Sequence, residues 1–454
     1  MENQKQAHDI EFDMFYCEQL LEQNKLEDVK SYIKKFFFKY KQDIFYFDGE
    51  KFELHNKADA LGLISKNLEK YQTIDKKSVQ VFSGRGFLQT TEFMKYEYTP
   101  TIDFTKPRTF EQIKVIDGVN ITKRHLNMAK PFAIDRSKKV DVKKYESDLK
   151  LIYDHILNIW CSKNDELYEY VLNWIACTFG GRKLRKCIYS QCEERCGRGC
   201  IINFLQSIFG DAMLKTSSAE TVSKYTKPFE GTLLVNLDEM PVDGSNFKSI
   251  ADNMKMLITE PTFDCRDMYK TGYTQKNTFN LIVTTNNDAI HMSLNNNTRY
   301  VCLDIDESMK SNVPYFTKLT KAIKKEEVKT AFYMEMMARF ETLNDWNEDI
   351  IPMSKTKQSK MIDALPSLYK FLKEYYILKS KSLDIRTDDF FELYEYETKD
   401  RTSKQKLGKL LKKINIVPIK VKKGNVQCYH YRKTHDELLE EFNKNSWIDD
   451  ENDK

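Results

Sequence analysis

The sequence is poor in glycine and proline and has no long apolar run. Of its 454 residues, 15 are Gly and 10 are Pro, and neither an internal repeat nor a low-complexity tract occurs. No stretch of about 18 apolar residues is present, so we expect no membrane-spanning segment and no membrane partner. The opening residues, MENQKQAHDIEFD, lack the apolar core of a signal peptide. These absences predict an intracellular protein that is not secreted.

Charged patches and metal-ligand patterns are also sparse. The net charge is only +4, so any surface for nucleic acid must be a local patch. The seven histidines show no ligand spacing, and ten cysteines without a secretion signal indicate reduced thiols. Four thiols gather at Cys187, Cys192, Cys196 and Cys200. Because the Cys-x2-Cys pair usual in zinc sites is missing, buried free thiols are the favoured interpretation, and a metal site is the alternative.

The remaining composition suits large folded cores. Hydrophobic residues make up 41% of the chain and aromatic residues 13%, and the length allows about two to four domains. Alternating strand and helix patterns predict an α/β fold with a mostly parallel sheet. Residues 43–54 alternate around Asp48-Gly49, which predicts a hairpin, whereas residues 75–145 give no clear pattern. We expect a small N-terminal α+β accessory module at 1–144, a core at 145–350, a linker at 351–366 and a C-terminal module at 367–454.

The core is organised around residues 186–210, KCIYSQCEERCGRGCIINFLQSIFG. The first apolar residues predict a short buried strand, and the two glycines predict a tight turn. The spacing of Ile201, Phe204, Leu205 and Ile208 predicts a helix. Strand, glycine turn and helix is the layout of a phosphate-binding loop, in which backbone N–H groups and the helix N-terminus hold phosphates.

The loop departs from the pattern G-x-x-x-x-G-K-[ST]. Cys192 stands at the first glycine, Arg198 at the lysine and Gly199 at the hydroxyl residue. Arginine is a planar fork where the pattern has a compact ammonium. Gly199 offers no metal ligand, and the neighbouring Cys200 is a soft ligand poorly suited to Mg²⁺. From this stretch alone, a nucleotide site and an ordinary strand–turn–helix are equally good interpretations.

Three further motifs lie at the ends of apolar strands. GTLLVNLDEM carries Asp238-Glu239, and NTFNLIVTTNN carries Asn286 near its end. In ATPases an Asp at such a position orients Mg²⁺, a Glu polarises the attacking water, and a polar amide holds the water or the terminal phosphate. Arg299 precedes a further strand. An Arg at such a position can act on the nucleotide bound to a neighbouring subunit. We expect the two acids and the amide at the tips of adjacent strands, facing Gly197.

Strand-tip motifs in this order resemble a superfamily 3 helicase, and more closely the helicase part of viral and plasmid primase–helicases of the poxvirus type and its phage relatives. The resemblance covers about residues 100–440, and it includes ELYEYVLNWIACTF and SIADNMKMLITEPTFDCRDMYKTGY. It implies an AAA+-like P-loop core, a homo-hexamer or mixed ring, and movement along single-stranded DNA. A separate primase or polymerase is an implied partner, and the cytoplasm, the nucleus or a viral replication site is the implied location.

The resemblance also implies residue roles. ATP and Mg²⁺ are the implied cofactors, with the nucleotide held by Cys196, Gly197, Arg198, Gly199 and Cys200, and the metal by Asp238. The implied catalytic residues are Asp238, Glu239, Asn286 and Arg299. The implied DNA contacts in the central channel are Lys255, Arg266 and Lys270. The replaced lysine and hydroxyl weaken the expectation of hydrolysis.

The C-terminal module carries a basic patch. Between residues 401 and 424 there are nine Lys or Arg and no acid. Helical patterns followed by a hairpin around Gly424-Asn425 predict a winged helix whose third helix and wing contact phosphates. The expected contacts are Lys409, Lys412, Lys413, Lys422 and Lys423. The alternative is a solvated basic face. Thr434 and Glu437 predict a capping box for a final helix.

Two functional hypotheses follow. The first is a nucleotide-dependent DNA helicase or replication protein of a viral or mobile element. The second is a catalytically inactive helicase-like replication factor or scaffold that binds DNA without hydrolysing ATP. An unrelated α/β scaffold protein is a third, more distant hypothesis. Nucleotide binding with Mg²⁺-dependent hydrolysis separates the first two.

Overall fold

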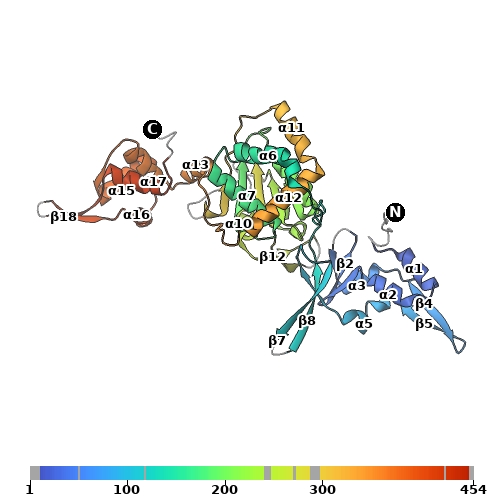
Figure 1. The fold of residues 1–454 in the computed structure, drawn as a ribbon. Coiled ribbons are helices and arrows are strands. Elements are labelled where there is room, and N and C mark those ends of the chain that lie inside the picture. The colour runs from blue at the N-terminus through green and yellow to red at the C-terminus, as the bar shows by residue number, and fades with distance from the viewer. Residues whose placement is uncertain are drawn as a thin grey trace.

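The structure is a computed structural model that describes residues 11–49, 52–116, 119–239, 247–268, 272–286, 297–423 and 426–448. Figure 1 shows three parts in chain order: an N-terminal part in blue and cyan, a central α/β part in green to orange, and a C-terminal part in red. The central part lies between the other two. Within the described residues, no helix is long and apolar enough to cross a bilayer.

The N-terminal part is built from short helices and mostly antiparallel strands. Its elements are α1 (Met14–Glu22), α2 (Leu26–Ile33), β1 (Phe37–Tyr40), β2 (Asp43–Phe47), β3 (Phe52–His55), α3 (Lys57–Gly62), β4 (Glu69–Ile74), β5 (Lys77–Ser83), α4 (Gly84–Phe87), α5 (Thr91–Met94), β6 (Tyr98–Thr101), β7 (Thr109–Ile116) and β8 (Val119–Asn127). The hairpin predicted around Asp48-Gly49 is confirmed, because β2 and β3 pair antiparallel with Phe47 opposite Phe52.

Two hairpins, β4–β5 and β7–β8, extend outward from the N-terminal part (Figure 1). On β7, Ile113 and Val115 are 64% and 69% exposed. On β8, Ile121 is also exposed and, by its pairing with position 114, lies on the other face of the hairpin. Apolar residues therefore occur on both faces of the β7–β8 hairpin, so its strands show no alternation between a buried and a solvated side.

The central part is organised around a parallel sheet with the strand order β10-β11-β14-β9-β15. All neighbouring pairs among these described strands are parallel, which confirms the predicted α/β fold with a parallel sheet. The strands are β9 (Cys187–Gln191), β10 (Met213–Thr216), β11 (Leu234–Asp238), β14 (Asn280–Thr285) and β15 (Tyr300–Cys302). Strand β9 is buried on both faces, with Cys187 and Tyr189 in one apolar cluster and Ile188 in another.

Helices and a second strand pair surround this sheet. They are α6 (Glu146–His155) with the π-helical turn Ile156–Trp160, α7 (Asp165–Phe179), α8 (Arg198–Phe209), α9 (Ala219–Ser223), α10 (Phe247–Thr259), α11 (Val313–Ile323), α12 (Glu326–Glu341), and the antiparallel pair β12 (Thr262–Cys265) and β13 (Tyr273–Lys276). The helices α7, α8 and α12 share one apolar cluster with the sheet, in which Trp174, Phe204 and Phe332 are fully or almost fully buried.

The C-terminal part has its own apolar cluster, which contains residues from Met361 to Trp447. Its elements are α14 (Ser367–Leu372) with the π-helical turn Lys373–Ile377, β16 (Leu383–Arg386), α15 (Thr387–Thr398), α16 (Lys404–Lys413), β17 (Ile419–Lys423), β18 (Val426–Lys433) and α17 (His435–Lys444). The three strands form an antiparallel sheet in the order β16-β18-β17. The predicted capping box of Thr434 and Glu437 is confirmed. The predicted hairpin tip at Gly424-Asn425 lies outside the described residues.

Residues 351–366, which we expected to form a linker, contain the helix α13 (Lys355–Asp363). The side chain of Asp304, just after β15, accepts hydrogen bonds from the backbone of Lys355 and Thr356 at 2.9 and 2.8 Å. The polar composition concealed this helix because two of its buried side chains are lysines, Lys357 and Lys360.

Candidate functional site

The glycine loop connects β9 to α8. Gly197 caps the helix with a φ of 99°, in the left-handed region that residues with a side chain rarely adopt. A Cβ atom at Gly197 would lie 2.7 Å from Cε1 of His155 and 2.8 Å from Cε1 of Phe316. No side-chain hydrogen bond caps α8, although the backbone N–H of Cys200 already donates to the carbonyl oxygen of Gly197 at 3.1 Å. The N-terminus of a helix attracts anions. The left-handed backbone at position 197 and the lack of room for a side chain both require glycine there.

His155, at the end of α6, packs against the loop. Its side chain is fully buried, with Nδ1 2.8 Å from the hydroxyl of Tyr315 and Nε2 3.0 Å from the carbonyl oxygen of Gly197. Because a carbonyl oxygen only accepts, this second hydrogen bond places the proton on Nε2. Burial lowers the pKa of His155, and the hydrogen bond to Gly197 partly opposes that shift. Sequence reasoning missed His155, because no local pattern links it to the loop.

The carboxyl ends of three neighbouring strands meet beside the loop. Asp238, at the end of β11, lies opposite the next-to-last residue of β14, and Thr285, the last residue of β14, lies opposite Gln191 of β9. Glu239 and Asn286 follow directly after these strands. The structure thus brings the two acids and the amide to the sheet edge from which the loop leaves β9. Their chemical roles stay predictions.

The side chain of Arg198 bridges the loop and the tip of β14. Its Nη1 donates a hydrogen bond to the backbone oxygen of Thr285 at 2.7 Å, and its Nη2 donates to Oδ1 of Asn286 at 3.3 Å. Asn286 donates in turn through Nδ2 to Oε1 of Glu239 at 3.4 Å. Glu239 has a φ of 50°, so its backbone is also in the left-handed region. The guanidinium therefore lies between the loop and the strand tips, where the lysine of a phosphate-binding loop reaches the terminal phosphate.

Both carboxylate oxygens of Asp238 already have partners. Oδ1 accepts a hydrogen bond from the hydroxyl of Thr284 at 2.6 Å, and Oδ2 lies 3.0 Å from Nζ of Lys215. Partial burial would raise the pKa of Asp238, but these two partners and the charge of Arg198 hold it below the ordinary value. Lys215 lies on β10, and sequence reasoning did not identify it. A metal ion bound to Asp238 would therefore compete with the ammonium group of Lys215 for the carboxylate.

Cys192 and Cys196 lie close together at the start of the loop. Their sulfur atoms are 2.8 Å apart, and the Cys196 thiol also contacts the backbone oxygen of Glu193 at 3.1 Å. The hydrogen bond from Cys192 lowers the pKa of Cys196, whereas the same interaction and burial raise the pKa of Cys192. Among the described residues, no group of three or more His, Cys, Asp or Glu side chains is placed to hold a metal ion.

A cavity of about 830 Å³ lies over the loop, between α8 and α11. Residues 193–200 form one wall, and Phe316, Thr320 and Lys321 of α11 contribute to the other. This volume suits a nucleotide-sized ligand. Arg198 lines the cavity and also contacts the tip of β14. Arg198 therefore connects the cavity lining to the strand tips, whereas Asp238 and Glu239 do not line the cavity.

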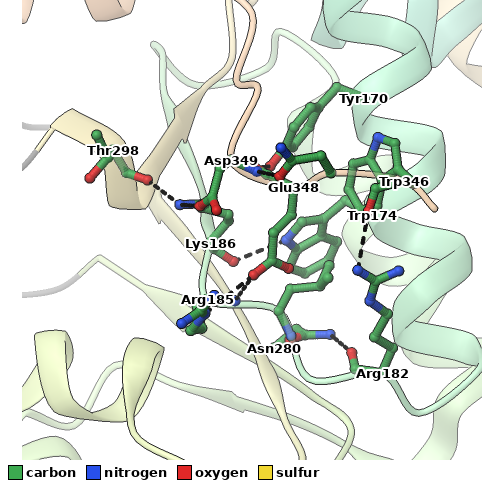
Figure 2. Close-up of polar contacts among 12 residues, drawn as sticks. Tyr170, Trp174, Arg182, Arg185, Lys186, Asn280, Thr298, Trp346, Glu348 and Asp349 are labelled. Atoms are coloured by element: carbon green, nitrogen blue, oxygen red, sulfur yellow. Dashed lines mark hydrogen bonds and ion pairs between the residues drawn. The ribbon is translucent and has the colours of Figure 1, made fainter. Parts of the chain in front are cut away.

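Arg299 is not brought to this edge. It precedes β15, whose first residue, Tyr300, pairs with Cys187 at the start of β9, so Arg299 lies at the opposite, amino edge of the sheet. Figure 2 shows the polar contacts at that edge, where Lys186 donates to the backbone oxygen of Thr298 at 2.8 Å and lies 2.6 Å from Asp349. The structure therefore does not place Arg299 beside the glycine loop of its own chain, and its role stays a prediction.

The residues implied as channel contacts lie around the β12–β13 pair. Lys255, on α10, forms an ion pair with Asp252 at 2.8 Å, and Arg266, after β12, forms one with Asp264 at 2.9 Å. Lys270 lies outside the described residues. Both described cations therefore have acidic partners within the chain.

The basic residues of the C-terminal part are less engaged. Lys409, Lys412 and Lys413 are exposed on α16, and Lys422 is exposed on β17, which Lys423 ends. Leu407 and Leu411 face the interior from the same helix, so the lysines cover its solvent side. None of the four exposed lysines forms an ion pair with a carboxylate among the described residues. Within the part of the chain that the structure describes, these four lysines thus carry positive charge without an ion-pair partner.

Comparison with known proteins gives a match to one family model over part of the chain, and a similarity of fold to solved structures. Residues 191–299 match the model of one family, described as a family of unknown function (DUF5906). The matched segment runs from the end of β9 to Arg299, and so contains the loop and the three strand tips. No curated protein matches the chain.

Solved structures of the NrS-1 C-terminal region share this fold. An apo structure of residues 305–718 of that protein has a TM-score of 0.55 at 13% identity, and covers 87% of this chain and 95% of that one. Two A-form apo structures of that region have TM-scores of 0.57 and 0.55, each at 12% identity. Each match covers 87% of this chain, and the matches cover 95% and 96% of the two NrS-1 chains. Identities this low show similarity of fold, over most of both chains.

Proposed function

We propose that this chain is a superfamily 3-type replication protein of a viral or mobile element, which binds a nucleotide at the glycine loop and acts on single-stranded DNA. One observation carries the proposal: an acid pair and an amide, from neighbouring parallel strands, lie at the edge where an uncapped helix follows a glycine turn. Ligands of open α/β sheets bind at that edge. The fold similarity to the NrS-1 C-terminal region supports a replication role.

The loop is suited to bind phosphate. The first turn of α8 offers backbone N–H groups, and the guanidinium of Arg198 can pair with two phosphate oxygens at once. To do so, Arg198 exchanges its present partners, the Thr285 carbonyl and the Asn286 amide, for the phosphate. That exchange frees Asn286 to orient a water or a phosphate oxygen.

The residues present fit Mg²⁺ poorly. Mg²⁺ prefers oxygen ligands in octahedral geometry, and the loop offers no hydroxyl at Gly199. The carboxylate of Asp238 is paired with Lys215. The pairing of Asp238 favours a second candidate function, a replication factor that binds nucleotide and DNA without turnover.

The C-terminal part supplies the DNA-binding element of this proposal. Its order of helix, strand, two helices and two strands supports the predicted winged helix. The exposed lysines lie on the last of these helices and the following strand. Backbone phosphates are the natural partners of such a patch.

Equilibrium binding and steady-state hydrolysis test the proposal together. We expect the protein to bind a fluorescent ATP analogue, and Arg198→Ala to weaken binding at least tenfold, because the bidentate phosphate contact is lost. Glu239→Gln should leave binding unchanged and serves as the blank for hydrolysis. Turnover stimulated by single-stranded DNA supports the motor, and binding without turnover supports the second candidate. Absence of both nucleotide and DNA binding would reject both.

A further inference from the structure

A second cavity, of about 590 Å³, lies between the N-terminal and central parts. Its walls come from the β2–β3 hairpin, from residues 103–108, from residues 127–136 and from the loop before β11. Its lining shares no residue with the cavity over the glycine loop. The first cavity is lined by the N-terminal end of α8. Phe132, which lines the second cavity, packs on Phe209 at the C-terminal end of α8, with ring centroids 5.2 Å apart. A helix of 12 residues separates the two cavities by roughly 18 Å.

A buried asparagine shapes one wall of this cavity. Asn127, which is 6% exposed, donates through Nδ2 to the backbone oxygens of Asp103 and Lys106 at 2.7 and 2.8 Å. Its Oδ1 accepts from the backbone N–H groups of Asp103 and Ala129 at 3.0 and 3.1 Å. The four hydrogen bonds of this side chain thus fix residues 103–106 against residues 127–129, and both segments line the cavity.

The lining combines aromatic faces with cations. The guanidinium carbon of Arg108 lies 3.7 Å from the ring centroid of Phe47, and that of Arg136 lies 4.6 Å from the centroid of Phe132. Lys130 donates to the backbone oxygen of Pro228 at 2.9 Å. Burial is the main reason that the pKa values of Lys130 and Arg108 are both lowered.

The charges in the lining do not cancel. Five basic and two acidic residues line the cavity. Glu230 is 2.5 Å from Lys227 and so neutralises that lysine, and Asp103 accepts hydrogen bonds from its own loop at Thr105. Among the described residues, neither Arg108 nor Lys130 forms an ion pair. Two partly desolvated cations thus line a cavity with aromatic walls, and the basic residues of the lining outnumber the acidic ones.

We infer that this cavity binds one nucleotide unit, as a free nucleoside phosphate or as part of a nucleic-acid strand. Arg108 and Lys130 contact the phosphate, and the base stacks on an aromatic or guanidinium face. The volume suits one nucleotide. Because the lining comes from both parts of the chain, the ligand holds the N-terminal part against the central sheet. This site is separate from the glycine loop and does not depend on it.

Photolabelling with 8-azido-ATP, followed by mass spectrometry of the peptides, tests the inference in the full chain. The Arg198→Ala background weakens the first site. We expect labelling within residues 47–52, 103–136 or 226–230 to persist in the Arg198→Ala background. This labelling should fall at least tenfold when Lys130→Met or Arg108→Gln is added. Lys138→Met, at an exposed position outside the lining, is the matched control and should keep the label. Melting curves of all variants verify folding, and Arg108→Lys replaces Arg108→Gln if the latter fails to fold.

Competition identifies the source of the nucleotide unit. Unlabelled ATP that displaces the label more efficiently than oligo-dT indicates a free nucleotide, and the reverse indicates a strand. Labelling confined to residues 193–200 and 311–324 would overturn the inference. Equal labelling of this cavity in Lys130→Met, Arg108→Gln and the control would also overturn it.

Discussion

The Nε2 atom of His155 lies 3.0 Å from the carbonyl oxygen of Gly197, although 42 positions separate the two residues. The imidazole is buried, and its other nitrogen contacts Tyr315 of α11. The glycine loop is therefore fixed from outside its own sequence, by a side chain that bridges α6, α11 and the N-terminus of α8.

Substitution of His155 should change the pH dependence of stability. Burial lowers the pKa of His155 below the ordinary value of 6.5, so the unfolded chain takes up a proton at a higher pH than the folded chain. The contribution of this group is therefore fully present above pH 6.5 and is lost as the pH falls through the lowered folded pKa. At pH 7.5, His155→Gln should cost about 1 kcal/mol, the net value of one hydrogen bond. In urea unfolding at pH 7.5 and 5.5, the difference between wild type and variant should shrink at the lower pH; a constant difference contradicts the assignment.

Alanine should be tolerated at one glycine of the loop and not at the other. Gly197→Ala forces a side chain into the left-handed region, at a cost of about 1–2 kcal/mol, and drives a Cβ atom against His155 and Phe316. A Cβ atom at Gly199, inside the first turn of α8, meets nothing within 4 Å, and Gly199→Ala should gain about 0.5–1 kcal/mol of helix stability. Thermal unfolding of the two variants measures the contrast. Equal melting temperatures would contradict it.

Repair of the loop should restore hydrolysis. The triple variant Arg195→Gly, Arg198→Lys, Gly199→Ser removes a bulky residue at a φ of 65°, and supplies the ammonium and the hydroxyl that phosphoryl transfer uses. We expect its ATPase rate to exceed that of the natural chain at least tenfold. The assay runs with and without single-stranded DNA, and Glu239→Gln in the repaired background is the blank. Brisk turnover by the natural chain that disappears in Arg198→Ala would instead identify Arg198 as a working replacement for lysine.

Charge reversal on α16 and β17 should weaken DNA binding for all sequences alike. If Lys412 and Lys422 contact phosphates, Lys412→Glu with Lys422→Glu removes two of them. The slope of log K against log salt concentration should then become shallower by about two. Lys66→Glu with Lys138→Glu makes the same change of net charge at exposed positions elsewhere and is the control. Fluorescence anisotropy on two unrelated DNA sequences gives the slopes, and an unchanged slope would mean that the patch is only solvated.

Two thiols that line the same cavity should differ in reactivity. The hydrogen bond from Cys192 lowers the pKa of Cys196, whereas burial raises that of Cys200. Cys200 is nevertheless the more exposed of the two. Because the thiolate is the reactive form, iodoacetamide at pH 6.5 should modify Cys196 faster, and the preference should decline as the pH rises to 9. Mass spectrometry of timed samples measures the ratio, and a preference for Cys200 at pH 6.5 shows that exposure controls the reaction.

The local elements of the core were predictable from the sequence because their signals are local. A buried apolar run marked β9, helical spacing marked α8, and the polar residues after β11 and β14 marked a sheet edge. Parallel strands present their carboxyl ends at one edge, so Asp238 and Asn286 could be expected together.

The residues that fix the site were not predictable in this way. His155 and Lys215 reach their partners through tertiary contacts between elements far apart in the chain, and a single sequence gives no signal for such pairs. The same limit applied to α13, where buried lysines concealed a helix, and to the β7–β8 hairpin, which has apolar residues on both faces. The second cavity also escaped notice, because Arg108 and Lys130 come from segments without a motif.

The strand order of the central sheet also constrains how the protein is made. Strand β9 pairs only with β14 and β15 among the described strands, and β14 begins at Asn280. During translation, β9 therefore emerges roughly 90 residues before its first partner, an interval of about 5 to 20 seconds at ordinary synthesis rates. Both of its edges are unpaired during that time, and unpaired edges with apolar side chains are prone to aggregation. The glycine loop joins the sheet edge only after β14, which ends at Thr285, has been synthesised.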